Sequence, residues 1–457
     1  MTEHPYDVVV LGGGSGGYAA ALRAAELGKS VALVERDKVG GTCLHRGCIP
    51  TKALLHAAEV ADAAREAASF GVRATLEGID VAGVRAYQEG IVAKKHRGLE
   101  GLIKARGITV VAGDGMLQPD RTITVGDDVL RGTDVVLATG SYSRSLPGLE
   151  IGGRIITSEQ ALTLDEVPAT VAILGGGVIG VEFASVWRSF GAEVTIIEAL
   201  DHLAPNEDVA LSKGLERAFR KRGIAFSLGV RFASATQTDD AVTVTLEDGK
   251  TFEADLLLVA VGRGPATSGM GFEEAGVVLE RGFVRTDERL RTDVPGVWAV
   301  GDIVRGLQLA HRGFQQGVFV AEQIAGLDPL PVPEAHIPRV TYCSPELASV
   351  GLTQAQAEQA HGADGVRAYE YSLAGNGKSE IIGTTGLVKV VRLVDGPVLG
   401  VHLLGDRVGE LITEGQLAVG WEANPEDIAP LIHAHPTQSE ALGEAFLALA
   451  GKPLHAL

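Results

Sequence analysis

The stretch VVVLGGGSGGYAAALRAAELGKSVALVE, residues 8–35, decides the fold. An apolar run leads into the pattern G-x-G-x-x-G, a helical pattern follows, and a second apolar run ends in Glu35. This order predicts a strand, a phosphate-binding turn, a helix and a second strand, as in a dinucleotide-binding fold. Gly12 permits the turn, Gly14 lets backbone N–H groups approach a pyrophosphate, and Gly17 lets the helix pack closely on the strand. We expect the Glu35 carboxylate to accept hydrogen bonds from ribose hydroxyl groups.

A second copy of this pattern, VAILGGGVIGVEFASVWRSFGAEVTIIE, occupies residues 171–198. The separation between the first motif glycine and the closing glutamate is the same in both copies. The roles of Gly12, Gly14 and Gly17 are repeated by Gly175, Gly177 and Gly180. Glu198 repeats the role of Glu35. Two such sites in one chain imply two bound dinucleotides. No arginine follows Glu198 to hold a 2′-phosphate, so the second site favours NAD over NADP.

The composition is that of an ordinary globular protein, with 46% hydrophobic and 21% charged residues. A chain of 457 residues is too long for one hydrophobic core, so two or three domains are expected. The net charge of −18 argues against nucleic acid and anionic membranes as partners. The sequence contains no run of about 18 apolar residues, so no membrane span is predicted. The acidic start MTEHPY has no basic region, which together with only three cysteines indicates a cytoplasmic protein.

Two of the cysteines, Cys43 and Cys48, lie in GGTCLHRGCIPTK, residues 40–52, at the expected start of a helix. An ideal helix would place their Cα atoms roughly 8–9 Å apart, whereas a disulfide tolerates less than about 7 Å. A bridged pair would therefore require a distorted helix, for which Gly47 supplies backbone freedom and Pro50 removes a hydrogen-bond donor. A redox pair, a zinc site and two inert thiols are the alternatives. Zinc takes about four ligands, and only two histidines lie nearby in the sequence, so no metal site is expected.

This stretch resembles the redox motif of the pyridine nucleotide–disulfide oxidoreductases, G-G-T-C-L-x-x-G-C-I-P-S/T-K. Other landmarks of that family match in order: ATGS at 138–141, VGR at 261–263, TDVPGVWAVGD at 292–302, LAHRG at 309–313 and HAHPTQSE at 433–440. The resemblance covers essentially the whole chain. It implies FAD in the first nucleotide fold, NAD in the second, and a redox-active disulfide between the two cysteines.

The implied fold class is α/β, with two Rossmann-like dinucleotide-binding domains and an α+β C-terminal dimerisation domain. The FAD-binding domain is expected over residues 1–146 and 264–334, with the NAD-binding domain, 147–263, inserted between them. A proline-rich linker, LDPLPVPEAHIP at 327–338, marks the boundary of the dimerisation domain, which is expected over 335–457. The resemblance also implies a homodimer.

The resemblance implies different roles for the two cysteines. Cys43 would form the mixed disulfide with a dithiol substrate, and Cys48 would lie under the flavin. A thiolate is the nucleophile, so a base must take the thiol proton. His435 is the candidate base, oriented by Glu440, and the resemblance implies that this dyad comes from the partner subunit. His433 is the weaker candidate of the two histidines.

The remaining site residues that the resemblance implies belong to the cofactor sites. Lys52 would lie beside flavin N5 with Glu182 as its ion-pair partner, and Asp302 would meet the ribityl chain. The other implied FAD contacts are Thr42, Gly115, Thr139, Gly140, Ser141, Ala310 and His311. For NAD, the resemblance adds Val230 and Gly262.

Within the family, the pattern favours oxidation of dihydrolipoamide to lipoamide with reduction of NAD⁺. HAHPT is followed by SE, the tail is AGKPLHA (450–456), and no C-terminal cysteine pair is present. The expected partner is the lipoyl domain of a 2-oxo acid dehydrogenase complex acyltransferase, or a glycine cleavage protein. The alternative is another FAD-dependent disulfide reductase, of glutathione, mercuric or quinone type, that uses NAD(P)H. An inactive structural subunit is disfavoured, because both cysteines and the dyad are present.

A few positions depart from the family pattern: His45-Arg46, Gly264, Gln315-Gln316 and Cys343. His45 and Arg46 replace the more common Asn-Val inside the redox loop, and we expect them to contact backbone or water. Gly264 stands where arginine is usual, and the two glutamines stand where acids are common. Cys343 has no partner in the sequence, so we expect a buried, unreactive thiol.

Overall fold

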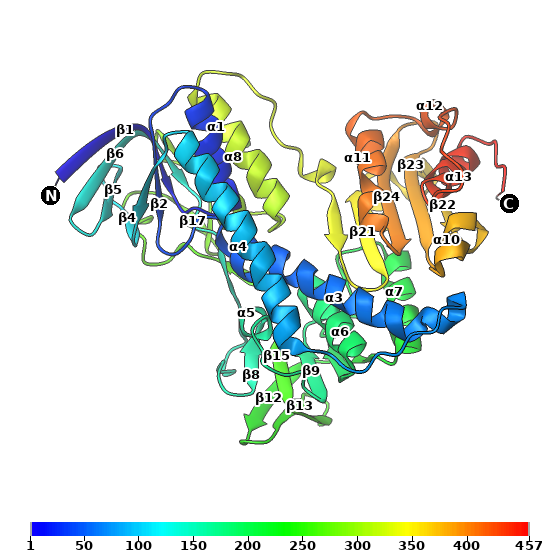
Figure 1. The fold of residues 1–457 in the computed structure, drawn as a ribbon. Helices are drawn as coiled ribbons and strands as arrows, with labels where there is room; N and C mark the ends of the chain where they lie inside the picture. Colours follow the sequence, from blue (N-terminus) through cyan, green and yellow to red (C-terminus); the bar gives the residue numbers. More distant parts are fainter. Residues whose placement is uncertain (1, 456–457) are drawn as a thin grey trace. The chain divides into compact units, whose positions relative to one another are not determined.

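The computed structural model describes residues 2–455 of the chain (Figure 1). The tail AGKPLHA reaches residue 456, which lies outside the described residues. The chain forms two compact units. The first comprises Met1–Leu54, Ala82–Arg144 and Gly262–Glu334, and the second comprises Leu55–Val81, Ser145–Val261 and Ala335–Leu457. The second unit holds both the expected NAD-binding segment and the C-terminal segment, so the limits of three domains stay a prediction.

A mixed sheet forms the centre of the first unit, with strand order β3-β2-β1-β6-β5-β4 and β19 paired with β6. Its strands are β1 (Thr2–Leu11), β2 (Val31–Glu35), β3 (Thr109–Ala112), β4 (Gly115–Leu117), β5 (Thr122–Val125), β6 (Asp128–Leu137) and β19 (Val297–Ala299). β1, β2, β3, β6 and β19 pair in parallel, and β4 and β5 are antiparallel additions. Three successive residues of β1, Val8 to Val10, are completely buried, as in a strand covered on both faces.

Helices of the first unit are α1 (Ser15–Glu26), α2 (Gly41–Arg46), α4 (Val81–Ala105) and α8 (Ala310–Ile324), and α3 (Cys48–Glu66) begins there. Helices α1 and α8 lie side by side (Figure 1). A Cβ atom on Gly317 would lie 2.3 Å from the Gly16 carbonyl oxygen, so glycine is needed at this crossing. Two short antiparallel pairs complete the unit: β7 (Ser141–Ser143) with β16 (Arg263–Pro265), and β17 (Leu279–Glu280) with β18 (Phe283–Val284).

The second unit contains a parallel five-stranded sheet of order β11-β10-β9-β15-β8. Its strands are β8 (Ile155–Thr157), β9 (Thr170–Leu174), β10 (Glu193–Ile197), β11 (Ala225–Ser227) and β15 (Leu256–Val259). The helices of this part are α5 (Ser158–Ala161), α6 (Val178–Phe190) and α7 (Val209–Arg222). An antiparallel sheet is formed by β12 (Phe232–Gln237), β13 (Val242–Leu246) and β14 (Thr251–Ala254).

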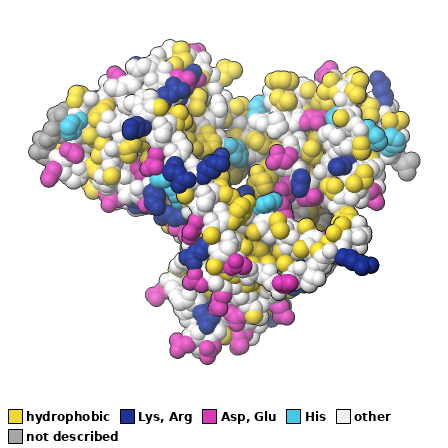
Figure 2. Space-filling view, viewed as in Figure 1, with side chains coloured by type: hydrophobic (Ala, Val, Ile, Leu, Met, Phe, Trp, Pro, Cys, Tyr) yellow, Lys and Arg dark blue, Asp and Glu magenta, His cyan; other side chains and the backbone are white. Residues whose placement is uncertain are grey.

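Acidic side chains gather over the region of β12 and β13 (Figure 2). Asp239, Asp240, Glu247 and Asp248 are all exposed there. Such a surface repels polyanions. Among residues 2–455, no helix is both long enough and apolar enough to span a bilayer.

The C-terminal part of the second unit is α+β. Its antiparallel sheet has the order β20-β21-β24-β23-β22: β20 (Arg339–Thr341), β21 (Glu346–Gly351), β22 (Val366–Ser372), β23 (Leu387–Leu393) and β24 (Val398–Gly405). Its helices are α9 (Gln354–His361), α10 (Gly377–Ile382), α11 (Ile412–Gly420), α12 (Pro425–Ile428) and α13 (Glu440–Leu449). Leu442 and Phe446 of α13 are fully buried in one core with Val388 and Val390 of β23. The predicted fold class is confirmed: two α/β nucleotide-binding folds and an α+β C-terminal part.

Candidate functional site

The first glycine loop has the construction that its sequence predicts. Gly12 has a φ of 104°, and a Cβ atom there would lie 2.3 Å from the Ala138 carbonyl oxygen. A Cβ atom on Gly17 would lie 1.8 Å from the Gly12 oxygen, so only glycine allows α1 to pack this closely. A Cβ atom on Gly14 would meet nothing within 4 Å. Gly14 caps α1 without a side-chain hydrogen bond, which leaves N–H groups of the first turn available to an anion.

The second loop has the same construction at the corresponding residues. A Cβ atom on Gly175 would lie 2.4 Å from the Ala260 oxygen, and one on Gly180 would lie 1.9 Å from the Gly175 oxygen. A Cβ atom on Gly177 would have open space, and Gly177 caps α6 without a side-chain bond. Both loops therefore fit a pyrophosphate group that approaches the backbone.

The two acidic residues that close the motifs hold the loops as well. Glu35 accepts hydrogen bonds from the backbone N–H groups of Gly13, at 2.8 Å, and Asp37, at 2.9 Å. Glu198 accepts the equivalent bonds from Gly176, at 2.6 Å, and Leu200, at 2.8 Å. Each carboxylate oxygen has a second lone pair and so can accept a further hydrogen bond, as the predicted ribose contacts require. Glu35 is the last residue of β2, whereas β10 ends one residue before Glu198.

A polar chain links three separate segments of the first unit near the expected flavin site. The Ser141 hydroxyl donates to Asp302 Oδ2 at 2.5 Å. Arg263 Nε donates to the same hydroxyl at 2.8 Å, and Arg263 Nη2 donates to the Ser141 carbonyl oxygen at 2.9 Å. Asp302 lies in a short 3-10 turn, Gly301–Ile303, directly after β19. Arg263 was not predicted as a site residue, although the VGR motif that contains it was recognised.

Several predicted cofactor residues occupy loop or helix-end positions. Gly140 and Gly262 have φ values of 79° and 103°, a conformation that favours glycine. The Thr139 hydroxyl donates to the Ala266 oxygen at 2.5 Å. The other predicted positions are Thr42 in α2, Ala310 and His311 at the start of α8, and Val230, whose N–H donates to the Glu198 oxygen at 3.2 Å.

Gly115 has a packing reason that the sequence did not reveal. A Cβ atom on this residue would lie 2.4 Å from Leu11 Cδ1 and 2.9 Å from Val34 Cγ1. The glycine is therefore required by the core of the sheet, whatever its distance from a cofactor.

The helix that was expected at the cysteine pair is broken between the two residues. Helix α2 contains Cys43 and ends at Arg46, and α3 begins at Cys48, with Gly47 between them. A hydrogen bond joins the side chains of the two cysteines. The helix is thus interrupted at Gly47, which is the distortion that a bridged pair would require.

The surroundings of Cys43 act on its pKa in opposite directions. The hydrogen bond with Cys48 raises the pKa of the Cys43 thiol most strongly, and burial raises it further. The positive charge of Lys52 and a hydrogen bond with Ser15 lower it. Burial also raises the pKa of Tyr18 to about 12, with a smaller effect from Cys43. Ser15 and Tyr18, from the first glycine loop and α1, are neighbours of the thiol that the sequence did not reveal.

The two unusual residues of the redox loop have ordinary partners. His45 Nε2 lies 2.9 Å from the Val39 carbonyl oxygen, and its ring meets that of His96 edge to face. Burial lowers the pKa of His45. The exposed Arg46 forms an ion pair with Asp37. His45 thus contacts backbone as expected, and Arg46 has a carboxylate partner.

Two histidine–glutamate pairs occupy the C-terminal motif. His435 Nδ1 lies 2.9 Å from Glu440 Oε1, and the His435 side chain is 80% exposed. Thr437 N–H donates to Glu440 Oε2 at 2.8 Å, and this bond is the main cause of the lowered pKa of Glu440. His433 Nε2 lies 2.8 Å from Glu414 Oε1, which raises the pKa of the more buried His433. The sequence identified the first pair; Glu414, which completes the second, lies on α11 and was not predicted.

Glu182 and Cys343 lie close together in the second unit. Glu182, on α6, is 3% exposed and accepts a hydrogen bond from the Tyr342 N–H at 2.9 Å. The predicted pairing of Glu182 with Lys52 joins the two units and stays a prediction. Cys343 is 1% exposed, its thiol donates to the Pro345 oxygen at 3.1 Å, and burial raises its pKa. The expected buried thiol is confirmed.

Two departures from the family pattern have local explanations. A Cβ atom on Gly264 would lie 2.6 Å from Tyr142 Cζ, so the tyrosine ring occupies the space of a larger residue. Gln316 Oε1 accepts a hydrogen bond from the Gly301 N–H at 2.8 Å and thereby supports the turn of Asp302. Within the described part of the chain, no three His, Cys, Asp or Glu side chains are grouped as a metal site requires.

Comparisons with known proteins agree with this geometry. The family model described as pyridine nucleotide-disulphide oxidoreductase matches residues 6–317, and the model of its dimerisation domain matches residues 337–446. A dihydrolipoyl dehydrogenase of Bacillus subtilis (strain 168) is 42% identical over 471 residues, which cover 98% of this chain and 99% of the relative. Dihydrolipoyl dehydrogenase 3 of Pseudomonas putida is 40% identical, over 98% of this chain and 98% of the relative.

Solved structures also share the fold over nearly the whole chain. LpdA from Mycobacterium tuberculosis matches with a TM-score of 0.89 at 28% identity, over 98% of this chain and 100% of that one. The flavoprotein disulfide reductase RclA from Escherichia coli, described as HOCl-induced, matches with a TM-score of 0.88 at 28% identity, over 97% and 99%. With both glycine loops, the cysteine pair and the dimerisation domain in place, this chain belongs to the pyridine nucleotide-disulphide oxidoreductase family.

Proposed function

We propose that this chain is an enzyme that oxidises dihydrolipoamide to lipoamide and reduces NAD⁺ to NADH. The observation that carries the proposal is the hydrogen-bonded pair Cys43 and Cys48 at the break between α2 and α3, in a chain 42% identical to a dihydrolipoyl dehydrogenase over nearly its full length. A dithiol is the substrate that a disulfide between two adjacent cysteines can oxidise by exchange through a mixed disulfide. The alternative, a reductase of glutathione, mercuric or quinone type, is not favoured by these relatives.

FAD and NAD are the cofactors. The two glycine loops fit them, because Gly14 and Gly177 leave open space for a pyrophosphate and each loop ends in an acidic residue. Bound flavin supplies two-electron chemistry between a dithiol and a nicotinamide. The buried Glu198 would repel a 2′-phosphate, which favours NAD over NADP in the second loop.

Cys43 is the thiol that we assign to exchange with the substrate, and Cys48 is the thiol that leaves when the mixed disulfide forms. Exchange begins when a substrate thiolate attacks Cys43 of the oxidised pair and Cys48 leaves as a thiolate. The second substrate thiol then displaces Cys43, which leaves lipoamide oxidised and the pair reduced. The positive charge of Lys52 favours thiolate at this pair.

His435 is the base that we assign to the substrate thiols. A carboxylate only accepts hydrogen bonds, so Glu440 places the ring hydrogen on Nδ1 and leaves the Nε2 lone pair free. The exposed imidazole can then take a proton from a thiol of the substrate. We assign the dyad to the site of the partner subunit, as the family resemblance implies.

The C-terminal dimerisation domain supports a homodimer. The lipoyl domain of a 2-oxo acid dehydrogenase complex acyltransferase, or a glycine cleavage protein, is the partner that we propose for the dihydrolipoamide group. A cytoplasmic location is part of the proposal, because a chain with three cysteines, two of them a redox pair, is typical of a reducing compartment.

The test compares two assays on the FAD-loaded protein. We expect NADH formation from NAD⁺ with dihydrolipoamide, and little oxidation of NADH or NADPH with glutathione disulfide. Cys48→Ser is expected to abolish NADH formation while FAD stays bound, since the loops that hold the pyrophosphate are unchanged. Absence of NADH formation in the unaltered protein would contradict the proposed activity, and loss of FAD from the Cys48 variant would make the thiol a structural residue.

A further inference from the structure

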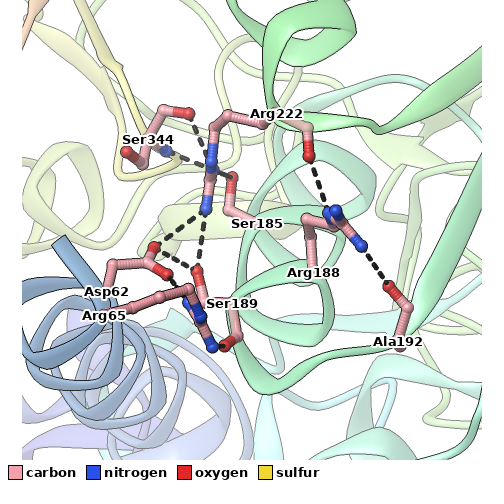
Figure 3. Close-up of polar contacts among 8 residues, drawn as sticks. All are labelled: Asp62, Arg65, Ser185, Arg188, Ser189, Ala192, Arg222 and Ser344. Carbon is pink, nitrogen blue, oxygen red and sulfur yellow. Dashed lines mark hydrogen bonds and ion pairs between the residues drawn. The ribbon is translucent and has the colours of Figure 1, made fainter. Parts of the chain in front are cut away.

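A polar cluster in the second unit joins four segments that are far apart in the sequence (Figure 3). We call Asp62, Ser185, Ser189, Arg222 and Ser344 the Arg222 cluster. Asp62 lies on α3, the two serines 185 and 189 lie on α6, Arg222 is the last residue of α7, and Ser344 precedes β21. Ser185 and Ser189 are each 2% exposed, so their hydroxyl groups depend on protein partners.

Arg222 is the centre of the cluster, because its two terminal nitrogens reach three of the four segments. Nη2 donates to Ser189 Oγ at 2.7 Å and to Asp62 Oδ2 at 3.1 Å. Nη1 donates to the Ser344 carbonyl oxygen at 2.9 Å and to Ser185 Oγ at 3.3 Å. A planar guanidinium can make this divergent set of bonds, whereas a lysine ammonium is a single point charge on a flexible stem.

The redox helix α3 is attached to α6 by a second set of bonds around the same carboxylate. The Ser189 hydroxyl donates to Asp62 Oδ2 at 2.5 Å. Arg65 forms an ion pair with Asp62, and its Nη2 donates to the Ser189 carbonyl oxygen at 2.7 Å (Figure 3). A hydrogen-bond network in which each member is satisfied holds its elements rigidly. The cluster therefore fixes the part of α3 that lies in the second unit, from Leu55 onward, against α6.

The same face of α6 carries Glu182. Glu182, Ser185 and Ser189 follow one another at helical spacing and so share one side of the helix. The segment before β21 runs along this side: Tyr342 N–H donates to Glu182 Oε1 at 2.9 Å, and Ser344 N–H donates to Ser185 Oγ at 3.1 Å. Arg222 holds the other end of that segment through the Ser344 oxygen.

We propose that Arg222 is a positioning residue of the redox reaction, which keeps the helix of Cys48 in register with the helix of Glu182. It acts through Asp62 and Ser189 and touches no reacting atom. The inference rests on the proposed function, which places Cys48 at the redox site, and on the prediction that Glu182 serves the same site. Small displacements of groups near reacting atoms cost rate more than binding.

The test compares Arg222→Gln with Arg220→Gln, in the FAD-loaded homodimer. Arg220 lies on the same helix with a 60% exposed side chain, over the Phe226 ring and 3.9 Å from Glu216, so its variant removes the same charge outside the cluster. One readout is the long-wavelength absorbance that a thiolate gives against oxidised flavin, after reduction with dithiothreitol. The other is the separation of kcat from KM with dihydrolipoamide and NAD⁺.

We expect Arg222→Gln to weaken the thiolate–flavin absorbance at unchanged FAD content, and to lower kcat by about tenfold with little change in KM. Arg222→Lys should restore only part of the loss, and Arg220→Gln should match the unaltered protein. Ser189→Ala, which removes one bridging hydroxyl, should lower the absorbance and kcat as Arg222→Gln does, but by less. If Arg222→Gln does not fold, Ser189→Ala is the variant that tests the inference.

If Arg222→Gln folds and its absorbance and kcat are unchanged, the inference is overturned. If Arg222→Gln does not fold, unchanged absorbance and kcat in Ser189→Ala would overturn it. A lower melting temperature alone would leave Arg222 a stabilising residue and nothing more. The dithiothreitol readout does not depend on the substrate. If the unaltered protein fails with dihydrolipoamide while Arg222→Gln still weakens the absorbance, the proposed substrate is wrong and the positioning role stands.

Discussion

At the scale of single residues, the two histidine–glutamate pairs of the C-terminal motif have the same chemistry but different exposure. His435 is 80% exposed and bonded through Nδ1, so Nε2 is available to a substrate. His433 is 14% exposed and uses Nε2 for Glu414. A base must present a free lone pair to the proton that it takes. The geometry therefore favours His435, as the sequence motif predicted.

The matched variants Glu440→Gln and Glu414→Gln separate these two pairs. Glu440→Gln removes the charge that stabilises a protonated His435, so we expect kcat to fall, within the limit of about 10²–10⁴-fold that general base catalysis contributes. Glu414→Gln should leave kcat within a small factor of the unaltered enzyme. Steady-state NADH formation measures both, and a larger loss from Glu414→Gln would reassign the base to His433.

At the scale of secondary-structure elements, the sequence predicted the helices whose first residue follows a glycine motif. Helices α1 and α6 begin directly after their G-x-G residues, at Ser15 and Val178, and the break at Gly47 is the distortion that the sequence predicted for a bridged pair. Helix α4 was not predicted, because Gly90, Gly98 and two further glycines weaken its local helical preference. The Arg222 cluster was not predicted either, since Arg222 and Asp62 are 160 residues apart and share no local period.

Replacing a glycine inside a helix by alanine can lower or raise the stability of the protein, depending on what surrounds the glycine. Gly317→Ala would place its Cβ atom 2.3 Å from the Gly16 oxygen, and the forced separation of α1 and α8 should cost about 1–3 kcal/mol. Gly98→Ala meets nothing within 4 Å on the exposed side of α4 and should stabilise by about 0.5–1 kcal/mol. Thermal unfolding of the FAD-loaded protein should show a lower midpoint for the first and an equal or higher midpoint for the second. A stabilising Gly317→Ala would contradict the close crossing of α1 and α8.

At the scale of the whole molecule, the proposed function divides the catalytic residues of one chain between two active sites of the homodimer. The cysteine pair lies in the first unit and the dyad lies in the C-terminal part of the second. The dimerisation domain over residues 337–446 contains His435 and Glu440, so the proposed catalytic dyad would give a homodimer a direct role in the reaction. The sequence could predict this arrangement only through the family resemblance, because contacts between subunits leave no period in one chain.

Subunit complementation tests whether each site needs two chains. We expect Cys48→Ser and His435→Gln each to inactivate a homodimer. In a mixed dimer, the intact cysteine pair of one chain can face the intact dyad of the other, which restores one of the two sites. Random pairing of the two variants on co-expression should therefore return about one quarter of the activity of the unaltered enzyme. Cys43→Ser paired with Cys48→Ser is the control and should return none, because every site then lacks a cysteine. If His435→Gln paired with Cys48→Ser also returns none while mixed dimers form, the dyad serves its own chain.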